Sequence, residues 1–208
     1  MKRQIDHIVY SVPNLEEAMQ ELEDLTGIRP TFGGYHTTQG TKNAVVNLGN
    51  SCYLEILAID EENLSIPAPR WMGIDFLEKP QITRWCLKSD NLTKDSQIVK
   101  AHQAEMGLIQ GGQRKMTNGK LLTWEMILPV PSPQVEIVPF MTDWQHSEIH
   151  PTDTMPTEYE FLGLRFTHPD PHSLTAVLDQ LNLEVDIVKA PELAIKMKMK
   201  TPNGIVEI

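Results

Sequence analysis

The chain has 208 residues, 40% of them hydrophobic and 22% charged, which is typical of a globular protein with a substantial buried core. Its 28 acidic and 18 basic residues give a formal net charge of −10, which disfavours binding to nucleic acid or to anionic membranes. No apolar stretch approaches the roughly 18 residues of a membrane-spanning helix, and the N-terminal residues lack a secretory signal pattern. We therefore expect an intracellular, cytoplasmic protein whose partner is a small molecule.

The first 60 residues predict a strand, a helix and three more strands. Residues 4–11 alternate as a strand does, so that His7 shares a face with Ile5 and Val9. Asn14 is a good N-cap for the helix that follows, and Gly27 suits the left-handed position at its end. The further strands are expected at residues 29–34, 42–48 and 52–59.

The same order of elements recurs twice along the chain. The second unit is expected to hold strand 82–88, helix 92–106 and strands 108–116, 121–128 and 134–140, with Asn118-Gly119 as a hairpin turn. The third is expected to hold strand 162–167, helix 172–181 and strands 184–189, 193–200 and 204–208. Proline-rich segments connect the units. We expect an α+β fold in which repeated βαβββ modules form curved mixed, mainly antiparallel sheets around a cleft.

These repeats also predict the domain organisation. Residues 1–141 would hold two paired modules, 4–60 and 81–141, and residues 160–208 a third, shorter βαβββ-like module. The two cysteines, Cys52 and Cys86, both fall in predicted strands. Two isolated thiols make neither a disulfide framework nor a zinc knuckle, so we expect both to be buried free thiols.

His7 and Glu55 are the candidate metal ligands of the first unit. Glu55 lies in the apolar strand 52–59, where an ionised carboxylate is costly unless it is paired or bound to a metal. His7 is the nearest plausible partner. An imidazole with a carboxylate suits a divalent manganese, iron, nickel or zinc ion. The alternative is a buried hydrogen bond between the two side chains without a metal.

Several separated motifs then carry a family resemblance. They are Ile5-Asp6-His7-Ile8-Val9, Val12-Pro13-Asn14-Leu15, Gly33-Gly34-Tyr35-His36, Gly40-Thr41-Lys42-Asn43, Tyr53-Leu54-Glu55, Pro139-Phe140-Met141-Thr142-Asp143-Trp144 and His150-Pro151. With the repeated modules, they resemble the vicinal oxygen chelate superfamily, which includes glyoxalase I, extradiol dioxygenases and bleomycin-resistance proteins. Within it, the glyoxalase-like domain branch is the most similar. A shared fold does not by itself imply a shared reaction.

The resemblance implies that a second module completes the metal site with a histidine and an acid. Aligning the starts of the two helices places Arg84 where that histidine would be, and arginine does not coordinate metals in proteins. Glu136 could stand for the acid, whereas the third unit offers only Gly163 at the histidine position. The ligand set is therefore incomplete.

Four further residues are candidates for the cleft. Arg84 could bind a carboxylate or phosphate group of the ligand, or form a salt bridge with Glu55 or Glu136. His36 could be a third ligand or a general acid/base, or a solvated loop residue. Asn43 could orient a substrate or brace the loop, and Tyr53 is a candidate substrate contact beside Glu55. We assign His36 and Glu136 the catalytic roles.

The remaining aromatic and histidine residues are expected to be structural. The tryptophans are interpreted as core or interface anchors, and most histidines of the proline-rich connections as exposed; these residues are Trp71, Trp85, Trp124, Trp144, His146, His150, His168 and His172. Pairing of two chains would complete a cup in many relatives, although the third unit could cover the same edge.

Two functions fit these residues. In the first, a small oxygenated metabolite that could bear a carboxylate binds in the cup, with metal-dependent lyase/isomerase or dioxygenase chemistry. In the second, a metal-free protein of the bleomycin-resistance type sequesters the ligand. Arg84 at a ligand position favours the second function, whereas the coexistence of His7, Glu55 and His36 favours the first.

Overall fold

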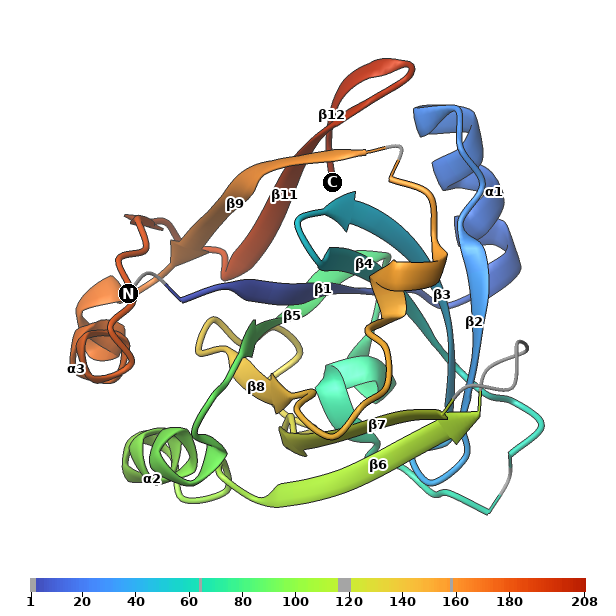
Figure 1. Ribbon diagram of the computed structural model, residues 1–208. Coiled ribbons are helices and arrows are strands. Elements are labelled where there is room, and N and C mark those ends of the chain that lie inside the picture. Colours follow the sequence, from blue (N-terminus) through green and yellow to red (C-terminus); the bar gives the residue numbers. More distant parts are fainter. Residues whose placement is uncertain (1–2, 64, 116–120, 158) are drawn as a thin grey trace.

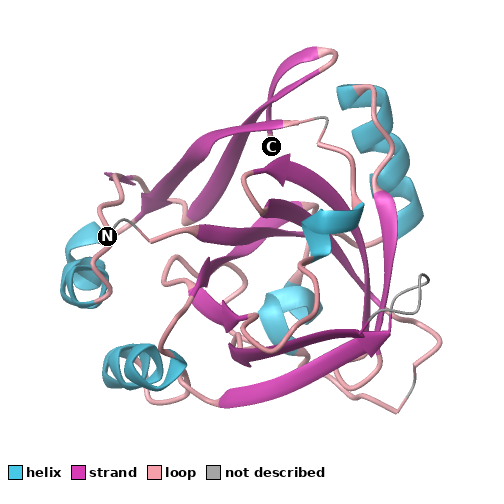
Figure 2. Cartoon of the chain, in the orientation of Figure 1, coloured by secondary structure: helices cyan, strands magenta, loops and turns pink. Residues whose placement is uncertain are grey.

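The computed structural model describes residues 3–63, 65–115, 121–157 and 159–208, with the backbone alone for residues 114–115. In these residues, twelve strands join into one curved, open sheet system that carries few helices (Figures 1 and 2). The strands mix parallel and antiparallel pairs, and most of the pairs are antiparallel. The expected α+β fold of repeated βαβββ elements is confirmed.

The first module follows the predicted order. It contains β1 (Ile5–Ser11), α1 (Leu15–Thr26), β2 (Thr31–His36), β3 (Thr41–Gly49) and β4 (Cys52–Ile59). Helix α1 begins where Asn14 accepts hydrogen bonds from the backbone amides of Glu16 and Glu17. It ends at Gly27, whose φ of 83° lies in the left-handed region that favours glycine. Both predicted helix boundaries are confirmed.

The second module repeats this order with two differences from the expected boundaries. It contains β5 (Gln81–Lys88), α2 (Leu92–His102), β6 (Ile109–Lys115), β7 (Leu121–Ile127) and β8 (Phe140–Asp143), preceded by the 3-10 helix η1 (Trp71–Phe76). Helix α2 ends four residues earlier than the predicted 106, and the last strand lies at 140–143 and not at 134–140. The expected turn at Asn118-Gly119 falls outside the described residues.

The displaced last strand has a physical explanation in residues 133–138. The prolines Pro133 and Pro139 lack the backbone N–H groups that a sheet ladder needs. Side chains of β5 bind the backbone carbonyls there, because Arg84 donates to the carbonyl of Gln134 and Trp85 donates to that of Ile137. This segment is therefore buried as an irregular strap, and the chain re-enters the sheet only at Phe140.

The first two modules share one pairing pattern. The first and last strands of each module pair in parallel, β1 with β4 and β5 with β8, and the remaining pairs are antiparallel. The antiparallel pair of β1 and β5 joins the modules, so that β2–β3 and β6–β7 form opposite arms of a curved sheet (Figure 1). The exact domain boundaries inferred from the repeats stay a prediction.

The third unit departs from that pattern. After the 3-10 helix η2 (Pro151–Thr154), it contains β9 (Glu160–His168), η3 (Pro171–Leu174), α3 (Thr175–Gln180), β10 (Ile187–Lys189), β11 (Ala194–Thr201) and β12 (Gly204–Glu207). Its first strand β9 pairs in parallel with β10, the strand directly after the helix, and antiparallel with β11. The third unit joins the rest of the sheet through β11, where Ile195 pairs with Ile82 of β5.

Two apolar clusters lie on opposite faces of the sheet. The larger joins the three helices to the sheet and includes Ile8, Leu22, Val99 and Leu178. The smaller lies on the face that bears the cleft and includes Val9, Leu57, Met72 and Phe140; Trp71 and Met126 also belong to it. Cys52 and Cys86 are buried free thiols, as expected. In the described residues, the search for a helix of membrane-spanning length and apolarity found none.

Candidate metal and ligand site

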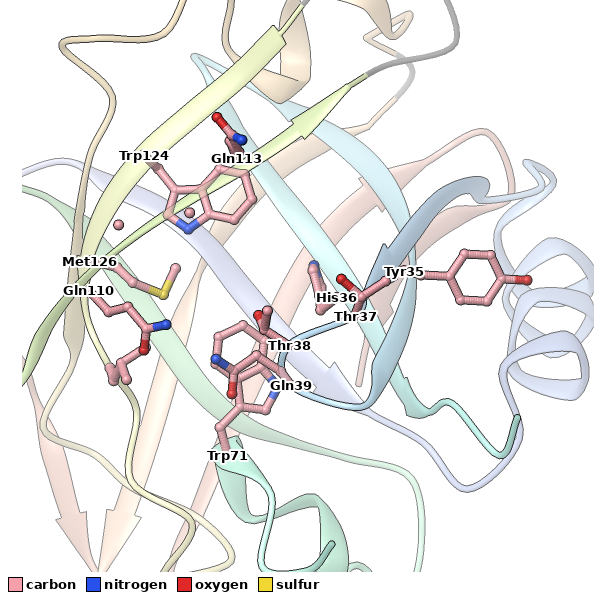
Figure 3. A pocket seen from close by; sticks show the side chains of 13 residues that line it. Tyr35, His36, Thr37, Thr38, Gln39, Trp71, Gln110, Gln113, Trp124 and Met126 are labelled. Carbon is pink, nitrogen blue, oxygen red and sulfur yellow. The ribbon is translucent and has the colours of Figure 1, made fainter. Parts of the chain in front are cut away.

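Two adjoining cavities lie between the arms of the sheet. The inner cavity, of about 40 Å³, is lined by both arms and includes His7, Asn43, Tyr53 and Glu55. The outer cleft, of about 550 Å³, is lined by β2, η1, β6 and β7 and the turn after β2 (Figure 3). They share His36, Trp71, Trp124 and Met126. The structure thus brings four predicted residues, and His36 as a fifth, to one continuous site.

Asp6 holds His7 in the inner cavity. The Nδ1 atom of His7 lies 2.6 Å from Oδ1 of Asp6, and both side chains are buried. Trp144 Nε1 donates to Oδ2 of Asp6 at 2.9 Å, and His150 Nε2 lies 3.1 Å from the same oxygen. Burial alone would raise the pKa of Asp6, but the hydrogen bonds with His150 and His7 lower that pKa to about 2. An ionised Asp6 keeps a proton on Nδ1 of His7 and leaves the Nε2 lone pair facing the cavity.

Glu55 lies between the two histidines of the cavity. Its Oε2 atom is 3.8 Å from His7 Nε2, and its Oε1 atom is 3.7 Å from His36 Nε2. Asn43 Nδ2 donates to Oε1 of Glu55 at 2.6 Å and lies 3.4 Å from His36 Nε2. An amide donor beside His36 Nε2 favours a lone pair on that nitrogen. Both ring nitrogens therefore present lone pairs near a carboxylate.

These distances fit a divalent metal ion. They exceed hydrogen-bond length, so the metal-free alternative of a direct bond between His7 and Glu55 is not formed. Two ligand atoms that each lie about 2.1 Å from one ion can be at most about 4.2 Å apart, and both histidine–carboxylate distances are shorter. Asn43 Oδ1 is buried and has no hydrogen-bond partner in the described residues, which leaves one more oxygen acceptor at the cavity wall.

A second group of metal-capable atoms lies on the other side of the imidazole of His7. Ligand atoms of Asp6, His7 and Cys86 lie within 4.8 Å of one another. However, the 2.6 Å contact between Asp6 and His7 is a hydrogen bond, and burial raises the pKa of the Cys86 thiol well above its ordinary value. The Nε2 side of His7 is therefore the better candidate for an ion.

Arg84 does not line either of these two cavities, in contrast to the expectation that it anchors the ligand. Its guanidinium donates to four backbone carbonyls, those of Thr83, Val130, Pro133 and Gln134. Among the described acidic side chains, none is within salt-bridge distance of Arg84. Burial lowers the pKa of Arg84 to about 10, so the group stays charged near neutral pH. The carbonyls of Val130 and of the strap residues Pro133 and Gln134 therefore bind this cation.

Glu136 also lies outside the two cavities that form the site. Its Oε1 atom accepts a hydrogen bond from the backbone amide of Val138, and its own amide donates to the carbonyl of Thr83. These contacts brace the strap against β5. The catalytic role expected for Glu136 therefore has no geometric support, because the carboxylate faces its own backbone.

Sequence reasoning missed the residues that position His7. Strand alternation puts Asp6 on the face opposite to His7, and the sequence predicts Trp144 as a core or interface anchor and His150 as exposed. In the structure, Asp6 binds His7, and Trp144 and His150 both bind the other oxygen of the Asp6 carboxylate. The ring of Tyr53 stacks on His7, with centroids 4.7 Å apart. The available signal was that Asp6, Trp144 and His150 all belong to the motifs of the family resemblance.

One solved structure supports this fold. A hypothetical protein from Staphylococcus aureus covers 99% of the chain and 85% of its own length at 17% identity, with a TM-score of 0.64. Methylmalonyl-CoA epimerase from Mycobacterium tuberculosis, at 17% identity, covers 67% of the chain and 85% of its own, with a TM-score of 0.40. No curated protein matches the chain. The sequence pattern of the glyoxalase-like domain matches residues 5–182. The chain therefore belongs to the glyoxalase-like domain family, as its resemblance to vicinal oxygen chelate proteins implied.

Proposed function

We propose that the chain binds a divalent metal ion with His7 and Glu55 and uses it to bind a small oxygenated metabolite. One observation carries this proposal: His7 Nε2 lies 3.8 Å from Glu55 Oε2, too far for a hydrogen bond and close enough for the two atoms to share an ion. An imidazole with a carboxylate suits manganese, iron, nickel or zinc.

The residues around the ligands have distinct roles in this proposal. Asp6 fixes the tautomer and the ring orientation of His7, as acidic partners of metal-bound histidines do. Asn43 holds the Glu55 carboxylate through its 2.6 Å hydrogen bond. Tyr53 stacks on the ring of His7 and forms part of the cavity wall. The ligands are thus held in position before an ion arrives, which lowers the entropy cost of binding.

His36 is the residue that moves a proton in this proposal. A bound divalent ion would polarise a carbonyl or hydroxyl oxygen of the ligand and so acidify the neighbouring C–H or O–H group. His36 Nδ1 lies 3.1 Å from the Thr41 hydroxyl, which orients the ring, and Nε2 faces Glu55. His36 also lines the outer cleft, where a ligand would enter. This arrangement favours proton transfer of the lyase/isomerase kind.

Metal analysis is the test of this proposal. Protein purified without an affinity tag or added metal should contain close to one manganese, iron, nickel or zinc ion per chain. Glu55→Gln and His7→Ala should abolish metal retention, because each removes a ligand. The apolar cluster between the helices and the sheet should stay unchanged. Glu136→Gln is the matched control, since this second buried glutamate lies outside the cleft and should leave the metal content unchanged.

The metal-free binding function keeps one observation in its favour. The second module supplies no ligand, because Arg84 and Glu136 are engaged by the strap. Protein that contains no metal, and that gains none when dialysed against each ion in turn, would favour this function over the metal-dependent one. Oxygen consumption with an iron-loaded sample would instead redirect the proposal from lyase/isomerase to dioxygenase chemistry.

A further inference from the structure

The outer cleft combines two indoles with uncharged polar side chains. Its described lining contains no lysine, arginine, aspartate or glutamate, and His36 is its single titratable side chain apart from the phenol of Tyr35. Trp71 and Trp124 lie on different walls, from η1 and β7 (Figure 3). Burying a carboxylate against such a wall would leave the charge unpaired. The cleft is therefore suited to an uncharged group.

The lack of a side chain at Gly112 leaves the space that the indole of Trp124 occupies. Gly112 of β6 pairs with Trp124 of β7, and a Cβ atom built at Gly112 would lie 2.5 to 2.7 Å from three atoms of the indole. No side chain at position 112 can therefore coexist with the ring in its present place. The ring lies across the bare backbone of the neighbouring strand and presents its other side to the cavities that it lines.

Trp71 is also fixed, although by a hydrogen bond. Its Nε1 atom donates to the Thr41 hydroxyl at 3.2 Å, and its ring meets His36 edge to face, with centroids 5.4 Å apart. Rigid indoles of this kind supply stacking surface at little cost in side-chain entropy. Gln39 and Gln110 line the same cleft and can donate to or accept from a neutral oxygen, but they cannot neutralise an anion.

We propose that the ligand carries an uncharged planar ring, bearing a hydroxyl or carbonyl group, that stacks on Trp124 and Trp71 in the outer cleft. This inference rests on the proposed function for the oxygenated end of the ligand at the metal. It replaces the carboxylate-bearing ligand expected from Arg84, whose guanidinium is satisfied elsewhere. The ring would then occupy the outer cleft, and the oxygenated end of the ligand would occupy the adjoining inner cavity.

The test uses three simple probes and isothermal titration calorimetry. The probes are 2-naphthol, which is planar and neutral, 2-naphthoate, which is planar and anionic, and decahydro-2-naphthol, which is neutral but not planar. A carboxylate or phenol oxygen can coordinate a metal ion, so each titration is repeated on chelator-treated protein, in which binding reports on the outer cleft alone. We expect 2-naphthol to bind about tenfold or more tightly than 2-naphthoate and about fivefold more tightly than the decahydro compound.

Two adjacent glycines provide matched variants. Gly112→Ala should displace the indole of Trp124 and weaken 2-naphthol binding about five- to tenfold. Gly111 also lines the cleft, but Gly111→Ala should change the affinity less than twofold, because a Cβ there meets only the Trp124 carbonyl at 3.8 Å and leaves the indole in place. If Gly112→Ala does not fold, Trp124→Leu removes the same ring without altering β6.

Metal analysis of the same samples separates this inference from the proposed function. Gly112→Ala should keep the metal content of the wild type, since Trp124 is not a ligand. A protein without metal that still discriminates the probes would support the stacking site and contradict the metal-dependent function. Equal 2-naphthol affinity in Gly111→Ala and in Gly112→Ala or Trp124→Leu, or equal affinity for 2-naphthol and 2-naphthoate, would overturn the inference.

Discussion

The first and second modules share their strand order and pairing, yet they contribute differently to the site. In the first module, His7 and Glu55 face the inner cavity. At the position matching His7, the second module has Arg84, which binds backbone carbonyls of the strap. The second module instead supplies apolar and aromatic wall residues such as Trp124 and Met126. One repeat thus holds the candidate ligands, and the other shapes the space around them.

This comparison shows why a repeated fold does not imply repeated ligands. A buried guanidinium needs several acceptors, and the irregular strap between β7 and β8 provides them. The cation then stabilises the strap and becomes unable to reach a ligand. Substitutions in both modules should test this division of labour.

Arg84→Met should reduce the free energy of unfolding by about 3 to 5 kcal/mol, because it removes the donor that satisfies several buried carbonyls. Urea unfolding at neutral pH would measure the loss. Arg165→Met on β9 is the control, since its exposed ion pair with Glu207 should contribute less than about 1 kcal/mol. If Arg84→Met left the stability unchanged and weakened ligand binding, Arg84 would be a ligand-binding residue and not a structural one.

Asp6→Asn should weaken metal affinity about 10- to 100-fold while the fold stays intact, because the acidic partner of a ligand histidine tunes its orientation and basicity. Competition with a chelator of known affinity would measure the change. Asp143→Asn on β8 is a suitable control, since its carboxylate accepts from the backbone amide of Gln145. Equal metal affinities in the two variants would show that Asp6 has no role at the site.

The stability of metal-free protein should depend on Asp6 at low pH. Because the pKa of Asp6 is lowered from 3.8 to about 2 in the fold, its contribution is fully present above pH 3.8 and disappears as the pH falls through 2. The contribution is of the order of 2 kcal/mol. The difference in unfolding free energy between wild type and Asp6→Asn should therefore shrink between pH 4 and 2. A constant difference over that interval would contradict the lowered pKa.

The two helix caps should give the smallest effect and should be alike in both modules. Asn14→Ala removes the acceptor of the Glu16 and Glu17 amides, and Asn91→Ala removes that of the Lys94 amide. Each should reduce the free energy of unfolding by about 1 kcal/mol, and Asn→Asp at either position should restore most of it. Urea unfolding would measure both. A loss at only one cap would show that the modules differ in local structure as well as in ligands.

Local chemistry made much of the fold predictable from the sequence. Asn14 and Gly27 marked the limits of α1, and the apolar patterns gave the strands of the first module within two residues. The pattern failed at residues 134–140, where Val135 and Ile137 look like strand residues but belong to the buried irregular strap. Their burial comes from contacts with β5, which are distant in sequence and leave no local period.

For the site, the sequence by itself identified which residue types were present, namely a histidine and a glutamate on apolar strands of one module. Their convergence was expected from strand parity, which is a local property. Only the folded chain brings His7, Trp144 and His150 to the carboxylate of Asp6, which lies 144 positions before His150 in the sequence. The tertiary structure also decided that Arg84 turns to the strap, because a charged group binds whichever acceptors the folded chain brings within reach.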